Sequence, residues 1–141
     1  MKIVYDYAIS FLGLPYKWGG DDTIKGFDCS GLVQEILQSV GEDPAGDQSA
    51  QALFNHFEKT GEWNKYSCGS LAFYGNSVTE INHVAMMLDN YRIIEAGGGG
   101  SKTNTLDDAS TQNAYVRIRL LNNRKDLVAV IKPRYSKIGV L

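Results

Sequence analysis

Two neighbouring stretches decide the fold of this chain: PYKWGG at residues 15–20 and GFDCSGLV at residues 26–33. The second stretch predicts the start of a helix, because Asp28 stands where an N-cap belongs and an apolar stripe begins at Leu32. The stripe continues until a glycine, so we expect this helix over residues 29–40.

Cys29 opens that predicted helix. In a first helical turn, unpaired backbone N–H groups and the positive end of the helix dipole favour a thiolate, which is the reactive form of cysteine. Its place three residues before Leu32 on the buried stripe should also hold the side chain rigidly. Cys29 is therefore a candidate nucleophile. The alternative is a small buried cysteine, which is the commoner fate of a lone thiol.

The pattern around this segment predicts helices first and strands later. Two more helices are expected, at residues 2–12 and 48–59, from apolar residues spaced three and four apart. Strands are expected at residues 71–74, 83–88, 91–96, 116–120 and 127–131. This order is typical of an α+β fold, with helices packed on one side of an antiparallel sheet of about five strands. We expect one domain over residues 1–141.

The composition excludes several classes of protein. The chain has 141 residues, of which 43% are hydrophobic and 21% charged, which argues against disorder. No apolar run approaches the roughly 18–20 residues that a membrane-spanning helix needs. Two cysteines are too few for a disulfide framework and, with two histidines, too few for a zinc-finger spacing. The first residues lack the apolar core of a signal peptide, so we expect synthesis in the cytoplasm or a removed leader.

Charge is unevenly distributed, although the formal net charge is only −2. Residues 115–141 carry a net charge of +6 and the preceding residues −8. Such a basic end can contact nucleic acid or an acidic wall polymer, and the alternative is a solvated strand face. No aromatic residues interleave with these charges as a nucleic-acid stacking platform requires, so we expect no nucleic-acid partner.

A nucleophilic cysteine needs a base, and the chain has two histidines. His56 lies beside the apolar stripe of the 48–59 helix, which predicts a surface residue. His83 begins the most apolar strand, where its ring is either part of a site or a hydrogen-bonded structural group. Glu95 interrupts the following strand and could orient His83, unless it faces solvent. Weaker candidates for the same role are Asn82, Asp107 and Asp108.

Together these segments resemble the NlpC/P60 family of papain-like cysteine peptidases. The stretches at residues 15–20 and 27–33 carry most of the resemblance, and His83-Val84-Ala85 follows in the family's order. Residues 69–74 are similar to the family's Gly-Asp-Leu-x-Phe-Phe stretch, with Ser70 where Asp is usual. The resemblance covers roughly residues 3–97 and implies a papain-like fold.

The resemblance also implies an activity. Such enzymes are peptidoglycan endopeptidases that cleave the stem peptide after γ-D-glutamate, often before a diamino acid, through a thioester and without metal or cofactor. Carried over by position, Cys29 is the nucleophile, His83 the base and Glu95 the third catalytic residue, where the family more often shows His, Asn or Gln. Tyr16 matches a tyrosine that helps hold the oxyanion.

Further positions match substrate contacts of some family members. Asp28 and Ser30 correspond to residues that bind the free amino terminus of the stem peptide. Trp18 and Tyr74 either line the cleft or belong to the core. The four glycines at residues 97–100 form a loop that either lets substrate approach the backbone or is simply flexible. Cys68 lies in a glycine-bounded turn and is expected to be inert.

Two other functions stay open. One is a catalytically inert wall-binding or virion structural module of the same fold, which the departures at Ser70 and Glu95 favour. The other is a different thiol hydrolase or acyltransferase of a related fold, such as the CHAP amidases, whose sequences the stretches at residues 15–16 and 28–31 do not resemble. A chain without a visible leader or wall-binding repeat fits a bacteriophage endolysin or virion-associated hydrolase, or a bacterial enzyme without its leader. The oligomeric state is left open.

Overall fold

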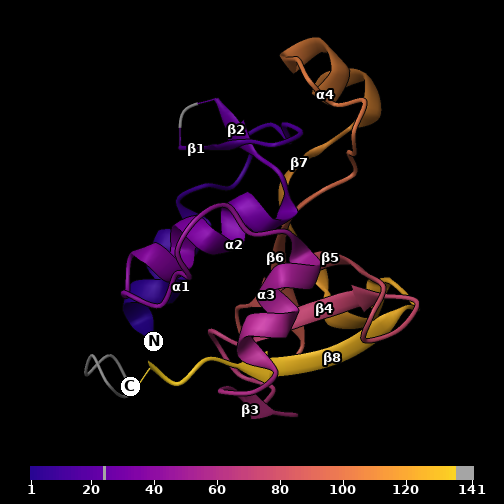
Figure 1. The fold of residues 1–141 in the computed structure, drawn as a ribbon. Helices are drawn as coiled ribbons and strands as arrows, with labels where there is room; N and C mark the ends of the chain where they lie inside the picture. The colour runs from indigo at the N-terminus through magenta and orange to yellow at the C-terminus, as the bar shows by residue number, and fades with distance from the viewer. Residues whose placement is uncertain (24, 136–141) are drawn as a thin grey trace.

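An antiparallel sheet of six strands, in the order β3-β8-β4-β5-β6-β7, forms the centre of the computed structural model, which describes residues 1–23 and 25–135 (Figure 1). Its strands are β3 (Glu62–Trp63), β4 (Leu71–Gly75), β5 (Ile81–Met87), β6 (Arg92–Gly97), β7 (Tyr115–Leu120) and β8 (Leu127–Lys132). The helices are α1 (Lys2–Ile9), α2 (Cys29–Gln38), α3 (Ala50–Phe57) and α4 (Leu106–Gln112), with a 3-10 turn at Leu121–Asn123. A separate two-stranded ribbon pairs β1 (Asp21–Asp22) with β2 (Gly26–Phe27).

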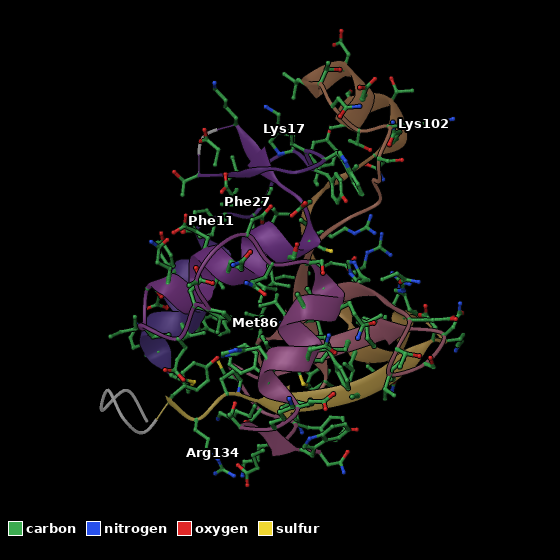
Figure 2. The ribbon with its side chains drawn as sticks, viewed as in Figure 1. Phe11, Lys17, Phe27, Met86, Lys102 and Arg134 are labelled. Carbon is green, nitrogen blue, oxygen red and sulfur yellow. The ribbon has the colours of Figure 1, made fainter. Side chains whose placement is uncertain are left out.

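This arrangement confirms the predicted α+β class and the antiparallel sheet. The sheet has six strands rather than about five, because Glu62–Trp63 pairs with β8 and adds a short edge. Helices α2 and α3 contact β5, and α2 also contacts β6, so these two helices cover one face of the sheet. Their apolar stripes and the inward side chains of the strands form the main core, in which Phe11, Phe27 and Met86 are buried (Figure 2).

The opposite face of the sheet carries a second, smaller apolar cluster. Its buried members are Ala72, Tyr74, Ala85, Met87, Ile93, Leu121 and Val130. Successive side chains of a strand point to opposite faces, so two cores require two apolar sets on one strand. This explains why β5 is an almost unbroken run of buried apolar residues, as the sequence pattern predicted.

The first helix is shorter than predicted. Helix α1 ends at Ile9 instead of continuing to residue 12. Beyond it, the N–H groups of Phe11, Leu12 and Leu14 bond to carbonyls three residues back, so the chain tightens into turns. Phe11 still reaches the core, whereas Leu12 is 44% exposed. The apolar stripe therefore predicted burial better than it predicted the helix end.

One α-helix was not expected from the sequence. Helix α4 lies within the long connection between β6 and β7, at the same end of the molecule as the β1–β2 ribbon (Figure 1). A capping box begins it: the Thr105 hydroxyl accepts a bond from the N–H of Asp108, whose carboxylate accepts one from the N–H of Thr105. Its run LDDASTQ has no apolar stripe, so the helical pattern gave no signal. No helix among the described residues is long and apolar enough to cross a bilayer.

Candidate active site

Cys29 is the first residue of α2, and Asp28 is its N-cap as predicted. One carboxylate oxygen of Asp28 accepts hydrogen bonds from the N–H of Gly31 (2.7 Å) and the hydroxyl of Ser30 (3.3 Å). The other accepts from the N–H of Gly19 (3.1 Å). Burial raises the pKa of Asp28, although these hydrogen bonds favour the ionised form. Asp28 therefore ties the start of α2 to the preceding loop and fixes where the thiol lies.

A close backbone approach holds this loop against α2. A Cβ placed on Gly31 would lie 2.1 Å from the carbonyl oxygen of Gly20. With a larger residue at position 31, the loop and the start of α2 could not both keep their positions. The N–H of Asp28 donates to the same carbonyl at 3.0 Å. Residue 31 therefore has a local steric reason to be glycine.

Tyr16 is held beside Cys29 by main-chain bonds on both sides of its segment. Its N–H donates to the carbonyl of Ala114 (3.0 Å), and the N–H of Lys17 donates to that of Phe27 (2.9 Å). The side chain is 5% exposed. Burial, followed by the charges of Cys29 and Asp28, raises the pKa of Tyr16. Its hydroxyl consequently stays protonated at neutral pH and is able to donate a hydrogen bond.

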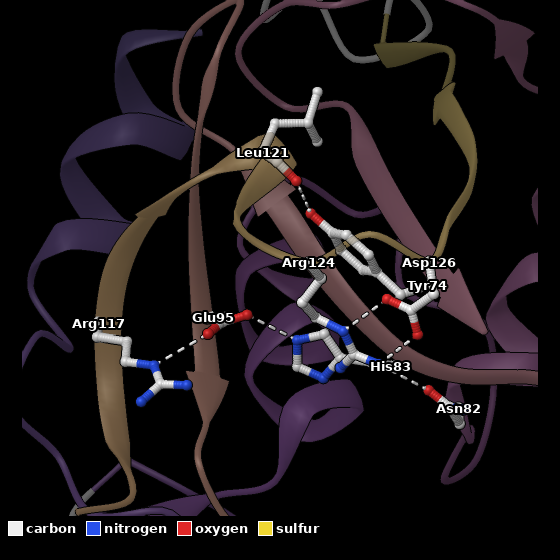
Figure 3. Close-up of polar contacts among 8 residues, drawn as sticks. All are labelled: Tyr74, Asn82, His83, Glu95, Arg117, Leu121, Arg124 and Asp126. Carbon is white, nitrogen blue, oxygen red and sulfur yellow. Dashed lines mark hydrogen bonds and ion pairs between the residues drawn. The ribbon is translucent and has the colours of Figure 1, made fainter.

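Three strands bring His83, Glu95 and Arg117 together on the face opposite the helices (Figure 3). The Nε2 atom of His83 lies 2.8 Å from Oε1 of Glu95, and Nε of Arg117 donates to Oε2 at 2.9 Å. Glu95 pairs directly opposite Arg117 in the β6–β7 ladder. His83 and Glu95 are both buried, at 8% and 4% exposure, so the solvent-facing alternative for Glu95 is wrong.

His83 and Glu95 each favour the charged form of the other. Burial by itself would lower the pKa of His83, but the interactions with Cys29 and Glu95 outweigh burial and raise it to about 9. Burial would likewise raise the pKa of Glu95, but His83 and Arg117 lower it to about 2. At neutral pH the structure therefore holds an imidazolium between Cys29 and the Glu95 carboxylate.

The weaker candidates for orienting His83 do not take that role. The amide oxygen of Asn82 accepts a bond from Arg124, and Asp107 is exposed on α4 beside the capping residue Asp108. None of the three contacts His83 through a hydrogen bond. His56 is exposed on α3, as expected.

Of the two aromatic residues considered for the cleft, one lines it and the other belongs to the core. Trp18 is 52% exposed and lines the cleft, so the core alternative is wrong for this residue. Tyr74 is fully buried, and its hydroxyl donates to the carbonyl of Leu121 at 2.8 Å. Its ring lies 5.6 Å from the His83 ring, so Tyr74 supports the histidine from beneath.

A groove passes over Cys29 and has two halves that share Tyr16, Trp18, Cys29 and Asn82. One half, of about 310 Å³, contains the His83–Glu95 pair together with the glycine run and Arg117, Asn123 and Arg124. The other, of about 430 Å³, contains Asp28, Ser30 and Asp47 among its lining residues. The catalytic and substrate-binding residues carried over from the resemblance therefore all line one groove: Tyr16, Trp18, Asp28, Cys29, Ser30, His83 and Glu95. Within residues 1–23 and 25–135, no three His, Cys, Asp or Glu side chains are grouped so as to hold a metal ion.

The glycine run at residues 97–100 forms one wall of this groove. A Cβ on Gly97 would lie 2.5 Å from Oε2 of Glu95, and one on Gly99 would lie 2.5 Å from the Tyr16 ring. These glycines leave room for the His83 partner and for the tyrosine. The run is thus built into the site instead of serving only as a flexible turn.

Sequence reasoning missed Arg117 and Arg124, which it counted only as part of a basic end. Arg117 bonds to Glu95, and Arg124 bonds to Asp126, so neither belongs to a simple solvated face. Lys137, another member of that end, lies outside the described residues. The signal for Arg117 was its alternation with Val116 and Ile118, but only strand register shows which residue it opposes.

Comparison with known proteins adds an independent line of evidence. A family model described as NlpC/P60 family matches residues 13–120. The bifunctional muramidase/DL-endopeptidase CwlT of Bacillus subtilis is 32% identical over 101 residues, covering 70% of this chain and 30% of CwlT. The probable peptidoglycan endopeptidase LytE of the same organism is 28% identical over 115 residues, covering 82% and 32%. The chain thus spans about a third of the length of these relatives.

Solved structures show the same fold. An NlpC/P60 family protein from Bacillus cereus superposes with a TM-score of 0.69 at 22% identity, covering 95% of this chain and 39% of that one. RipD from Mycobacterium tuberculosis, described as a non-catalytic NlpC/p60 domain protein adapted to peptidoglycan binding, superposes with a TM-score of 0.65 at 20% identity. That alignment covers 94% of this chain and 95% of RipD. The fold alone therefore occurs with and without catalysis.

Proposed function

This chain belongs to the NlpC/P60 family, and on that premise we propose that it is a cysteine endopeptidase that hydrolyses peptidoglycan stem peptides. The observation that carries the proposal is the position of Cys29 at the N-terminus of α2, in one groove with the buried His83–Glu95 pair. A nucleophile, a base and an orienting group within one cleft is the arrangement that acyl transfer requires. The relatives named for peptidoglycan endopeptidase activity supply the substrate class.

The proposed first step is attack of the Cys29 thiolate on the scissile carbonyl carbon. The resulting oxyanion accepts hydrogen bonds from the N–H of Cys29, which has no partner within the helix, and from the Tyr16 hydroxyl. The imidazolium of His83 then gives its proton to the leaving amine, the C–N bond breaks and a thioester forms. Glu95 holds the ring and stabilises its charged form throughout.

The second step is hydrolysis of the thioester. Neutral His83 takes a proton from water, the hydroxide attacks the acyl carbon, and the thiolate leaves as the imidazolium is restored. We place the scissile bond after γ-D-glutamate and before a diamino acid, which agrees with the DL-endopeptidase named among the relatives. Asp28 and Ser30 are the proposed contacts for the free amino terminus of the stem peptide, in the half of the groove that Asp47 also lines. Trp18 lines both halves beside Cys29.

Digestion of purified muropeptides, read by mass spectrometry, tests this function. The wild-type chain should cut between D-glutamate and the diamino acid, and Cys29→Ala should not. Cys68→Ala is the matched control, because Cys68 is half-buried away from the groove, where burial raises the pKa of its thiol, and its loss should leave cleavage unchanged. A cut at another bond would contradict the assigned specificity.

A second candidate function is a wall-binding module without turnover, which RipD exemplifies for this fold. The buried His83–Glu95–Arg117 group argues against it, because an inert module has no use for a polarised histidine beside a thiol. The labelling rate with iodoacetamide separates the two. A Cys29 that reacts no faster than a free thiol, together with no cleavage of walls of several chemotypes, would establish the binding module.

A further inference from the structure

The two halves of the groove differ in charge. Beyond the shared residues, the only charged side chains lining the half with Asp28 are Asp28 and Asp47, both acidic, within the described residues. The half with His83 is lined by Arg117 and Arg124. A substrate that lies along this groove meets carboxylates on one side of Cys29 and guanidinium groups on the other. We call these the acidic half and the basic half.

Arg124 is held in place within the basic half (Figure 3). Its Nε and Nη2 atoms donate to the two carboxylate oxygens of Asp126 at 2.9 and 2.7 Å, and Nη2 also donates to Asn82 at 3.2 Å. The guanidinium carbon lies 5.2 Å from the centre of the Tyr74 ring. The Nη1 atom has no hydrogen bond to any residue of 1–23 or 25–135. The guanidinium is thus already oriented, and its Nη1 atom remains able to donate to a substrate.

Arg117 has unused donors as well. Its Nε atom donates to Glu95, whereas Nη1 and Nη2 bond to no residue in the part of the chain that the structure describes. These two atoms lie next to the glycine run, where a Cβ on Gly97 or Gly98 would come within 2.9 and 3.1 Å of them. Because both positions are glycine, neither places a side chain over these two atoms.

We propose that the basic half binds a carboxylate of the stem peptide through the unused donors of Arg117 and Arg124. Guanidinium groups match the planar carboxylate and form charge-assisted hydrogen bonds with it. The inference deepens the proposed function and rests on it. It makes the groove select a substrate with its amine toward Asp28 and a carboxylate on the other side of Cys29.

Two carboxylates flank the proposed scissile bond. A γ-linked D-glutamate keeps its α-carboxylate free, and a diaminopimelate leaving group carries a side-chain carboxylate. Both present the same chemistry to Arg117 and Arg124. Four synthetic L-Ala-γ-D-Glu-diaminopimelate peptides separate the two sources, and in all four the C-terminal α-carboxylate of the diaminopimelate is amidated. One peptide has both remaining carboxylates free, two have either one amidated, and one has both amidated.

The measurement is kcat/KM for the four peptides with the wild-type chain and with Arg124→Gln. Amidation at one of the two positions should lower the wild-type kcat/KM about tenfold or more, and the sensitive position names the carboxylate that is bound. Arg124→Gln should reduce this discrimination to less than about threefold. Arg119→Gln is the matched control, because Arg119 lies two residues from Arg117 on β7, outside the groove lining, and its loss should leave the discrimination intact.

Binding of the same peptides to Cys29→Ala separates failure of the subsite from failure of the hydrolase. Cleavage of all four peptides at equal rates by the wild type would overturn the carboxylate subsite and leave the endopeptidase standing. Discrimination that survives in Arg124→Gln would overturn the role of Arg124. Binding that prefers the free carboxylate, without any cleavage by reduced wild type, would support the subsite and overturn the hydrolase. Absence of both binding and cleavage would overturn both.

Discussion

The two sides of the active-site groove are built in different ways. The nucleophile side, residues 13–33, is local: a cap, a helix start and one close backbone approach place Cys29. The base side takes His83 from β5, Glu95 from β6 and Arg117 from β7. Its geometry depends on strand register, and a slip of one residue would turn a whole strand to the other face. The active site thus combines a nucleophile that a rigid local motif places with a base that the pairing of distant strands places.

The largest expected effect comes from removing the reacting group on either side. Cys29→Ala and His83→Ala should each lower kcat/KM for a stem peptide by a factor of about 10³ or more, since neither group acts without the other. For the same reason the double variant should be no worse than the single ones. Steady-state kinetics of the three proteins tests this, and losses that multiply in the double variant would show that the two sides act independently.

A smaller effect is expected from altering the base side alone. Glu95→Gln offers one oxygen where His83 and Arg117 both need an acceptor, so one contact must be lost. We expect kcat/KM to fall roughly 10- to 100-fold and the alkaline limb of its pH profile to move to lower pH, because the carboxylate no longer raises the pKa of His83.

The double variant Glu95→Gln with Arg117→Met sharpens this comparison. It removes the donor that competes for the single oxygen of the glutamine, so part of the lost activity should return on the doubly amidated peptide, where Arg117 has no substrate carboxylate to bind. Kinetics of this variant beside Glu95→Gln is the measurement. No recovery would mean that Arg117 does more than balance the Glu95 carboxylate.

The same ion pairs predict how stability changes with pH. The pKa of His83 is raised to about 9, so its contribution to folding is complete below about pH 6.5 and is lost as the pH rises through 9. The pKa of Glu95 is lowered to about 2, so its contribution is complete above about pH 4.5 and is lost as the pH falls through 2. The melting temperature should fall further between pH 6 and pH 9.5 for the wild type than for His83→Gln. Equal falls would place the alkaline loss in other groups.

The smallest expected effect lies on the nucleophile side. Asp28→Ala removes the cap of α2 and should lower the free energy of unfolding by about 1 kcal/mol. Thr105→Ala removes the corresponding cap of α4, where the Thr105 hydroxyl accepts a hydrogen bond from the N–H of Asp108 at 3.1 Å, and should cost a similar amount. Thr105 is not among the residues that line the groove. Only the first should also lower kcat/KM, because only Asp28 positions Cys29 and is a proposed contact for the amino terminus of the substrate. Denaturant unfolding and kinetics of both variants test this distinction. Equal kcat/KM for the two variants would contradict the role of Asp28 in the active site.

Much of the fold and of the candidate site could be predicted from the chain itself. The helix at Cys29, its cap at Asp28 and the strand pairs that contain His83 and Glu95 follow from apolar spacing and turn residues. The end of α1 and the presence of α4 could not be predicted. The first depends on a local tightening of the turns, and the second on a capping box in a segment without an apolar stripe.

By itself the sequence determined the α+β class, the start of α2 and the set of groups able to do the chemistry. These depend on interactions within a few residues, which a pattern of residue types records directly. Only the tertiary structure decided that Glu95 turns inward, that Arg117 is its partner and that glycines at residues 97 and 99 make room for the site. Those facts depend on which residues oppose one another across β5, β6 and β7, and that register is set by the packing of the whole sheet.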